Sequence, residues 1–254
     1  MIRSAPTTSE ALVQVELMLP HELDAALAVR SVVYVPLGSI EYHSHHLPVG
    51  LDGLNAHGVC IAAAGRTGGV VLPPLWFGTG GSHTRYPWTI MTATQSPLRE
   101  LLDTVLCRLQ DLDVELIVLF TGHFADEQLD LIDTVAREWN ESGHRSRALP
   151  LAVNRTDATI AADHAGVFET TLLAALWPDR VFLDRLPDLS EAPIDQPIDG
   201  SFEHRHDPGH PLWGVMGPDP RASDLSTAGR LLDEVVGWTV AQVDSVLTAR
   251  EGTD

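Results

Sequence analysis

The chain has 254 residues, of which 44% are hydrophobic and 20% are charged, a composition within the range of ordinary globular proteins. This length accommodates one large α/β domain or two small ones, and we expect a single domain over residues 1–254. Asp and Glu outnumber Lys and Arg by 35 to 16, which gives a net charge of -19. Nucleic acid and anionic membrane surfaces are therefore not expected as partners, because both would repel the chain.

We expect neither a signal peptide nor a membrane-spanning helix. Residues 1–10 lack the apolar core of a secretory signal, and no apolar run reaches the roughly 18 residues of a membrane-spanning helix. Cys60 and Cys107 lie in apolar helical patterns, so we expect buried thiols in a reducing compartment. No Cys-x-x-Cys pair is present, which excludes thiolate zinc sites. These features predict a cytoplasmic protein.

The first strongly predicted strand covers residues 31–37 and follows helix-like stretches in residues 10–29. The next segment, residues 38–58, is interpreted as a loop at the C-terminal end of that strand, where open α/β sheets bind ligands. It is dense in ionisable side chains, namely Glu41, His43, His45, His46, Asp52 and His57. No packing role requires so many imidazoles beside two carboxylates, so the segment indicates a metal site. Such ligands suit zinc, manganese or iron.

Within this segment we favour Glu41, His43 and Asp52 as metal ligands. Glu41 and His43 are two residues apart, so in an extended segment they face the same side and can serve one site or two adjacent ones. The remaining histidines of the segment are expected to support the ligands, contact substrate or pack.

Helical and strand patterns alternate along the rest of the chain. Helices are predicted over residues 55–65, 96–112, 127–142, 167–177 and 223–247, and strands over residues 69–73, 115–121 and 148–154. This alternation predicts a single three-layer α/β/α domain with a largely parallel central sheet. Segments 74–92 and 184–221 have no regular period; the first is long enough to suggest a functional loop, and the second reads as a Pro-rich surface loop.

Two later strand ends also carry candidate site residues. His123 follows one strand, and His164 and Glu169 follow the last one. In a parallel sheet these ends lie at one edge, so the side chains can converge with Asp52, which could bridge two cations about 3.5–4 Å apart. His164 is the candidate for proton transfer. Asp163 beside it either orients the imidazole or caps the following helix.

Several motifs occur in order along residues 30–240. They are Gly38-Ser-Ile-Glu-Tyr-His, His46-Leu-Pro-Val-Gly-Leu-Asp52, the segment from Gly81 to Met91, Thr121-Gly-His123, Asp163-His164-Ala-Gly-Val-Phe-Glu169-Thr and Gly214-Val-Met-Gly217-Pro. In this order and spacing they resemble the creatininase (creatinine amidohydrolase) family. The resemblance implies a single α/β/α domain, assembled as a hexamer or another homo-oligomer, that hydrolyses carbon-nitrogen bonds with the help of divalent metals.

Carried over by position, the resemblance implies that Glu41 and His123 hold one metal, that His43 holds a second and that Asp52 bridges them. A metal-bound hydroxide would then attack an amide-type carbonyl of a small substrate. His164 matches the acid/base histidine of the family and would protonate the departing nitrogen. Two divalent cations per chain, zinc, manganese or iron, are the implied cofactors.

The chain departs from creatininase itself at two positions. Ala125 stands where creatininase has a glutamate ligand, and Glu169 is the expected replacement, so we count it both as a ligand and, with His164, as a candidate catalytic residue. Ile160 stands where creatininase has a tryptophan that covers its flat substrate, which argues against creatinine.

The Gly- and Trp-rich segment 74–92 contains three candidate substrate contacts, His83, Tyr86 and Trp88. The substrate itself stays open: relatives open cyclic amides, remove formyl groups or trim a small peptide during cofactor maturation. We expect a carbon-nitrogen bond other than an ordinary peptide bond, with the maturation peptidase as one alternative. Another alternative is a non-catalytic or single-metal protein that acts as a binding partner in a larger assembly. A dinucleotide enzyme is disfavoured because no Gly-x-Gly-x-x-Gly follows the first strand.

Overall fold

The computed structural model describes residues 13–81, 86–190 and 207–251. At its centre lies a four-stranded parallel sheet in the order β2-β1-β3-β4. The strands are β1 (Val32–Leu37), β2 (Val70–Val71), β3 (Leu116–Thr121) and β4 (Arg147–Ala152). Every residue of β1 and β3 is buried, as the continuous apolar runs of a sheet covered on both faces require.

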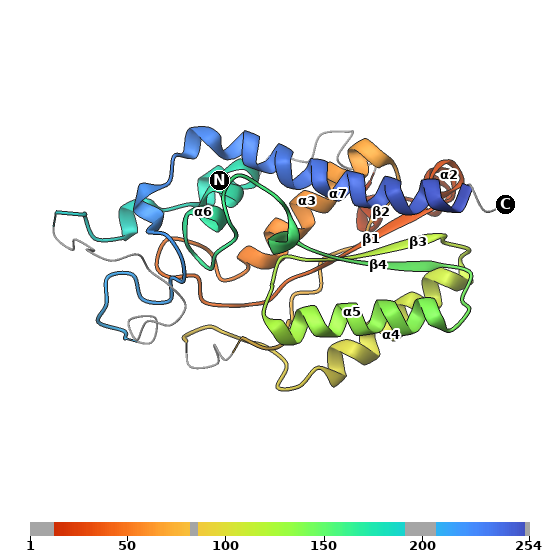
Figure 1. Ribbon diagram of the computed structural model, residues 1–254, viewed down its shortest axis with the longest axis horizontal. Helices are drawn as coiled ribbons and strands as arrows, with labels where there is room; N and C mark the ends of the chain where they lie inside the picture. The colour runs from red at the N-terminus through yellow and green to blue at the C-terminus, as the bar shows by residue number, and fades with distance from the viewer. Residues whose placement is uncertain (1–12, 82–85, 191–206, 252–254) are drawn as a thin grey trace.

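Helices cover both faces of the sheet, which confirms the predicted three-layer α/β/α fold (Figure 1). One layer consists of α3 (Leu51–Thr67), α6 (Val167–Leu176) and α7 (Ala228–Glu251), and the other of α2 (Pro20–Val29), α4 (Ser96–Asp111) and α5 (Asp126–Glu141). Successive side chains of β1 pack against opposite helical layers: Tyr34 packs against the first layer, and Val33 and Val35 pack against the second.

Short 3-10 helices connect these elements. They are η1 (Val15–Leu17), η3 (Val153–Arg155), η4 (Pro178–Arg180), η5 (Leu183–Arg185), η7 (Pro220–Ala222) and η8 (Leu225–Thr227). Among the described residues, no helix is both long and apolar enough to cross a membrane. Cys60 is buried as expected, but the expectation is wrong for Cys107, which is exposed on α4.

One predicted boundary is wrong in a way that matters for the site. Helix α3 begins at Leu51, not at residue 55, so Asp52 lies in its first turn and not in a loop. Gly53 makes this segment look like a loop in sequence, but in the helix it lets the indole of Trp76 pack against the backbone. The positive end of the helix dipole favours a carboxylate at this position.

The carboxyl ends of the three longer strands are level, because Leu37 pairs with Thr121 and Thr121 pairs with Ala152. The chain moves from β1 to β2 in one direction and to β3 in the other, so the sheet has its switch point beside β1 and β3. Open α/β sheets bind ligands at this place.

Two glycines allow the strand ends to close onto α3. A Cβ at Gly38, directly after β1, would overlap the backbone of Gly53, and a Cβ at Gly122, directly after β3, would overlap the backbone carbonyl of Asp52. The first turn of α3 is therefore held between the ends of the two central strands, and Asp52 with it.

Candidate metal centre

Six ionisable side chains meet at the switch point of the sheet, and each is at most 7% exposed. They are Glu41, His43, Asp52, His123, His164 and Glu169. The loop after β1, the first turn of α3, the loop after β3 and the start of α6 supply them. The structure thus brings together every ligand and catalytic residue expected from the sequence, although they span more than half of the chain.

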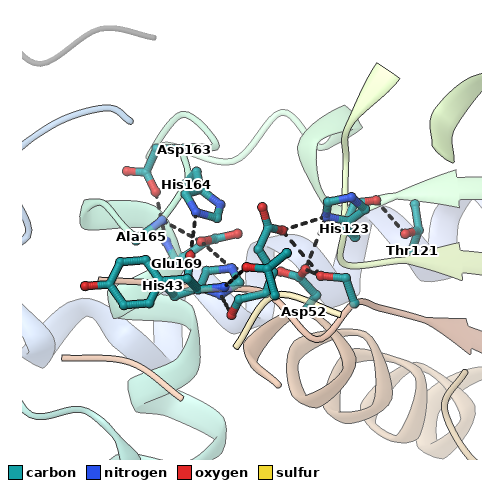
Figure 2. A network of polar contacts seen from close by, with 12 residues as sticks. His43, Asp52, Thr121, His123, Asp163, His164, Ala165 and Glu169 are labelled. Carbon is teal, nitrogen blue, oxygen red and sulfur yellow. Dashed lines mark hydrogen bonds and ion pairs between the residues drawn. The ribbon is translucent and has the colours of Figure 1, made fainter. Parts of the chain in front are cut away.

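Asp52 lies between two histidines (Figure 2). Its Oδ1 is 3.1 Å from His43 Nε2, and its Oδ2 is 3.2 Å from His123 Nδ1. His123 Nδ1 is also 3.0 Å from Glu41 Oε2, and His43 Nε2 is 3.5 Å from Glu169 Oε2. Three groups of potential ligand atoms result, and the atoms of each group lie within 4.8 Å of one another. Two of them share Asp52, namely Glu41 with Asp52 and His123, and His43 with Asp52 and Glu169; the third consists of Glu41, His43 and His164.

A backbone carbonyl orients the imidazole of His43 and another orients that of His123. His43 Nδ1 lies 2.9 Å from the carbonyl oxygen of Glu41, and His123 Nε2 lies 3.2 Å from that of Thr79. A carbonyl can only accept, so these nitrogens carry the hydrogen and the opposite nitrogens face the carboxylates. Histidine ligands of metals are commonly oriented in this way. Because the donor atoms are carboxylate oxygens and imidazole nitrogens, the cluster fits zinc, manganese or iron.

The buried carboxylates and imidazoles of the cluster shift one another's pKa values. Burial alone would lower the pKa of His43, but the Asp52 and Glu169 carboxylates outweigh it and raise this pKa to about 10. Burial also disfavours the charged form of His123, yet Glu41 and Asp52 raise the pKa of His123 well above its usual range. Burial raises the pKa of Glu169 well above its usual range. A cation that binds here must therefore displace protons.

Buried polar groups support the carboxylates. Ser39 Oγ lies 2.6 Å from Asp52 Oδ2 and donates to it, and the backbone N–H of Ala165 donates to Glu169 Oε2 at 2.6 Å. Burial opposes the ionisation of Glu41, but the neighbouring imidazoles lower the pKa of Glu41 to about 2. Sequence reasoning missed Ser39, because a serine beside a strand end carries no signal of such a contact.

Asp163 caps α6. Its carboxylate accepts hydrogen bonds from the backbone N–H groups of Gly166, Phe168 and Glu169 at 3.1, 2.9 and 3.3 Å. Of the two roles expected for this residue, the structure shows capping. Burial raises the pKa of Asp163 to about 6 in spite of these donors. The cap orients the first turn of α6, from which Glu169 reaches the cluster.

The cluster opens into a cavity of about 440 Å³. Ala125 and Met216 line it together with every residue of the cluster except His43, while Ile160 packs against the hydrophobic core instead. Of the expected substrate contacts, Tyr86 is buried against Tyr42 and Trp213, with ring centroids 5.5 and 5.6 Å away.

Trp88 is 76% exposed, and neither it nor Tyr86 lines this cavity. His83 lies outside the described residues.

The other histidines of the segment 38–58 lie apart from the cluster. His46 is buried, and its Nε2 lies 2.9 Å from Thr170 Oγ1. Burial is the main reason that the pKa of His46 is lowered to about 3. His45 is exposed beside Tyr42, and His57 lines a separate cavity between α3 and α6.

Two groups of buried carboxylates and imidazoles that share one carboxylate are typical of metal-dependent hydrolases with a binuclear centre. Comparison with known proteins specifies the class further. The family model described as creatinine amidohydrolase matches residues 16–243, and the chain belongs to the creatininase family. It is thus a creatininase-family hydrolase with potential metal-binding groups at the end of its sheet.

The curated relatives have two different activities. Creatinine amidohydrolase of Pseudomonas putida is 29% identical over 181 residues, which span 62% of this chain and 68% of the relative. The mycofactocin precursor peptide peptidase of Mycolicibacterium smegmatis is 30% identical over 169 residues, which span 64% of this chain and 65% of the relative. Family membership alone therefore does not identify the type of bond that this chain hydrolyses.

Among solved structures, a crystal structure of creatinine amidohydrolase (creatininase) matches with a TM-score of 0.72 at 25% identity, covering 92% of this chain and 97% of that chain. A manganese creatininase and a Zn-Zn type mutant creatininase match with TM-scores of 0.73 and 0.71 at 23% and 22% identity. At these identities the latter two show the likeness of fold.

Proposed function

We propose that the chain is a metal-dependent hydrolase of a carbon-nitrogen bond in a small amide-type substrate. One observation carries this proposal: the two carboxylate oxygens of Asp52 face two different imidazoles, those of His43 and His123. A carboxylate in this position can bridge two cations, each of which would then have one of the two imidazoles as a further ligand. The family match over residues 16–243 further supports one catalytic domain over residues 1–254.

In this proposal Glu41, Asp52 and His123 hold one divalent cation, and His43, Asp52 and Glu169 hold the other. Glu169 then occupies the ligand place left open by Ala125. The donor set suits zinc, manganese or iron, and the manganese and zinc forms of the creatininase structures support the first two. When bound, the cations would activate a water molecule and polarise the carbonyl oxygen of the substrate.

His164 is proposed as the general acid and base. Its Nε2 lies 3.1 Å from the carbonyl oxygen of Tyr42, so Nε2 keeps its hydrogen and Nδ1 is the atom that exchanges a proton. The backbone of His164 pairs with that of Met216 through two hydrogen bonds of 2.9 and 2.8 Å, which hold the imidazole at the cavity wall. His164 would take a proton from the attacking water and deliver it to the leaving nitrogen.

The proposed substrates are amides, cyclic amides and formamides that fit the cavity of about 440 Å³. Ile160 is partly buried, packs against the hydrophobic core and does not line this cavity, which disfavours creatinine. The similarity to a peptide peptidase at 30% identity favours a second candidate, cleavage of a peptide bond in a small peptide. Assays with N-formyl compounds, cyclic amides and short peptides show which of these bonds the protein hydrolyses. We also propose that the active form is a homo-oligomer.

Elemental analysis of the purified protein tests the metal centre. We expect about two metal ions per wild-type chain, about one in Glu169→Ala, and none in Asp52→Ala, because only Asp52 belongs to both groups. Glu100→Ala, which removes an exposed carboxylate from α4, is the matched control and should keep both ions.

A wild-type chain without metal after zinc or manganese has been added back would contradict the proposal. The chain would then be a non-catalytic binding partner. Retention of two ions in Asp52→Ala would remove its bridging role.

A further inference from the structure

Four buried residues around His123 form a closed ring of hydrogen bonds. Gln128 Nε2 donates to Thr121 Oγ1 at 2.8 Å, and Thr121 Oγ1 donates to the carbonyl oxygen of His123 at 2.6 Å. His123 Nε2 donates to the carbonyl oxygen of Thr79 at 3.2 Å, and the N–H of Thr79 donates to Gln128 Oε1 at 3.0 Å. None of the four residues is more than 4% exposed.

The direction of each hydrogen bond in the ring follows from chemistry. The N–H of Thr79 can only donate, so the oxygen of the Gln128 amide must face it and the NH₂ group must face Thr121. The Thr121 hydroxyl accepts from this NH₂ group and passes its own hydrogen to the carbonyl of His123. Every member is satisfied, and such closed buried networks make the positions of their members rigid.

The ring holds His123 at two points, its backbone carbonyl and its Nε2. These two points set the plane of the imidazole and direct Nδ1 toward Glu41 and Asp52, at 3.0 and 3.2 Å. Gly78 lies so close to the Gln128 amide that a Cβ there would overlap Oε1. The amide is therefore tightly packed between the loop around Thr79 and the start of α5.

The other half of the cluster is held differently. His43 Nδ1 donates to the carbonyl oxygen of Glu41 at 2.9 Å, and the N–H of Ala165 donates to Glu169 at 2.6 Å. Backbone groups supply both contacts. Gln128, Thr121 and Thr79 thus support one half of the cluster and not the other.

We propose that Gln128 is a positioning residue for one of the two metal positions. Acting through Thr79 and Thr121, Gln128 sets the metal affinity of the position formed by Glu41, Asp52 and His123. It does not affect the metal affinity of the position that contains His43. This inference rests on the proposed binuclear centre. Loss of a group that orients a metal ligand typically weakens metal binding about 10- to 100-fold.

Two variants break this ring of hydrogen bonds in independent ways. Gln128→Leu keeps the approximate size of the side chain and removes both of its hydrogen bonds, whereas Thr121→Val keeps the shape of the side chain and removes its hydroxyl. Asn140→Leu is the matched control: Asn140 lies on the same helix and pairs with the backbone N–H and carbonyl of Ala148, both at 2.9 Å. Thermal unfolding of each variant shows whether it folds.

The measurement is a calorimetric titration of the metal-free protein with Co²⁺, combined with the visible absorption of the bound Co²⁺. Wild type and Asn140→Leu should show two binding events. Gln128→Leu and Thr121→Val should weaken one event about 10- to 100-fold, change its absorption band and leave the other event unchanged. If Gln128→Leu does not fold, Thr121→Val decides the question.

The titration tests the positioning role of Gln128 separately from the binuclear centre. Unchanged affinities in folded ring variants, or an equal weakening of both events, would overturn the positioning role while the binuclear centre stands. A wild-type protein with no Co²⁺ event would overturn the proposed function and this inference with it.

Discussion

Nε2 of His164 lies 3.1 Å from the backbone carbonyl oxygen of Tyr42. Because the carbonyl can only accept a hydrogen bond, Nε2 keeps its hydrogen, and Nδ1 is the atom that would exchange a proton in the proposed mechanism. The ring of His164 also lies against that of His43, with centroids 4.4 Å apart. His164 also forms a potential ligand group with Glu41 and His43, but the two groups that share Asp52 are complete without it.

His164→Ala should therefore keep two metal ions per chain and lose turnover by about 10²- to 10⁴-fold, the usual contribution of a general acid and base. Elemental analysis and the turnover number on a hydrolysed amide check both parts. His45→Ala, at an exposed position, is the control and should behave as wild type. Unchanged turnover would remove His164 from the mechanism, and loss of a metal ion would make it a ligand.

Metal binding should release protons at pH 8. The pKa of His43 is raised to about 10 in the metal-free protein by Asp52 and Glu169, which outweigh the effect of burial. The imidazole is therefore protonated at pH 8, and the cation must displace this proton, so affinity should rise with pH up to about 10. Titration calorimetry in two buffers of different ionisation enthalpy measures the release. Equal apparent enthalpies in the two buffers would show that no proton leaves.

His46 should make the fold sensitive to acid. Its pKa is lowered from 6.5 to about 3, chiefly by burial. Between these values the unfolded chain binds a proton that the folded protein excludes, so stability that is present above pH 6.5 is lost as the pH falls toward 3.

Between pH 7 and pH 5, metal-free wild type should lose about 2 kcal/mol more unfolding free energy than His46→Gln, which can keep the hydrogen bond to Thr170. Urea unfolding at the two pH values gives the difference. Parallel losses in the two proteins would show that His46 is not the acid-sensitive group.

Gly122→Ala should destabilise the protein by about 1–3 kcal/mol, because its Cβ would overlap the backbone carbonyl of Asp52 and force β3 and α3 apart. Gly65→Ala is the matched control. It lies inside α3 with open space around its Cβ position, so the lower entropy of the unfolded chain should stabilise the protein by about 0.5–1 kcal/mol. Urea unfolding compares the two variants, and equal stabilities would refute the close approach.

The sequence by itself determined the order of strands and helices and the place where the site forms. The apolar runs of β1 and β3 are buried on both faces, which only a covered parallel sheet provides. Parallel strands align their carboxyl ends, so the convergence of His123 with Asp52 follows from the topology. The start of α3 did not follow from local pattern, because Gly53 favours a loop in isolation, and its close packing with Trp76 exists only in the folded chain.

Tertiary structure alone decided which polar residues support the cluster. The sequence favoured His43 as a ligand but left three roles open for His46, and only the structure shows that His46 packs against Thr170 of α6. Gln128 looks like any polar residue in the first turn of a helix until the chain brings it to Thr79, which lies 49 residues earlier. Local sequence encodes periodicity and chemistry, but a hydrogen bond between distant segments exists only after the sheet and both helical layers have placed them side by side.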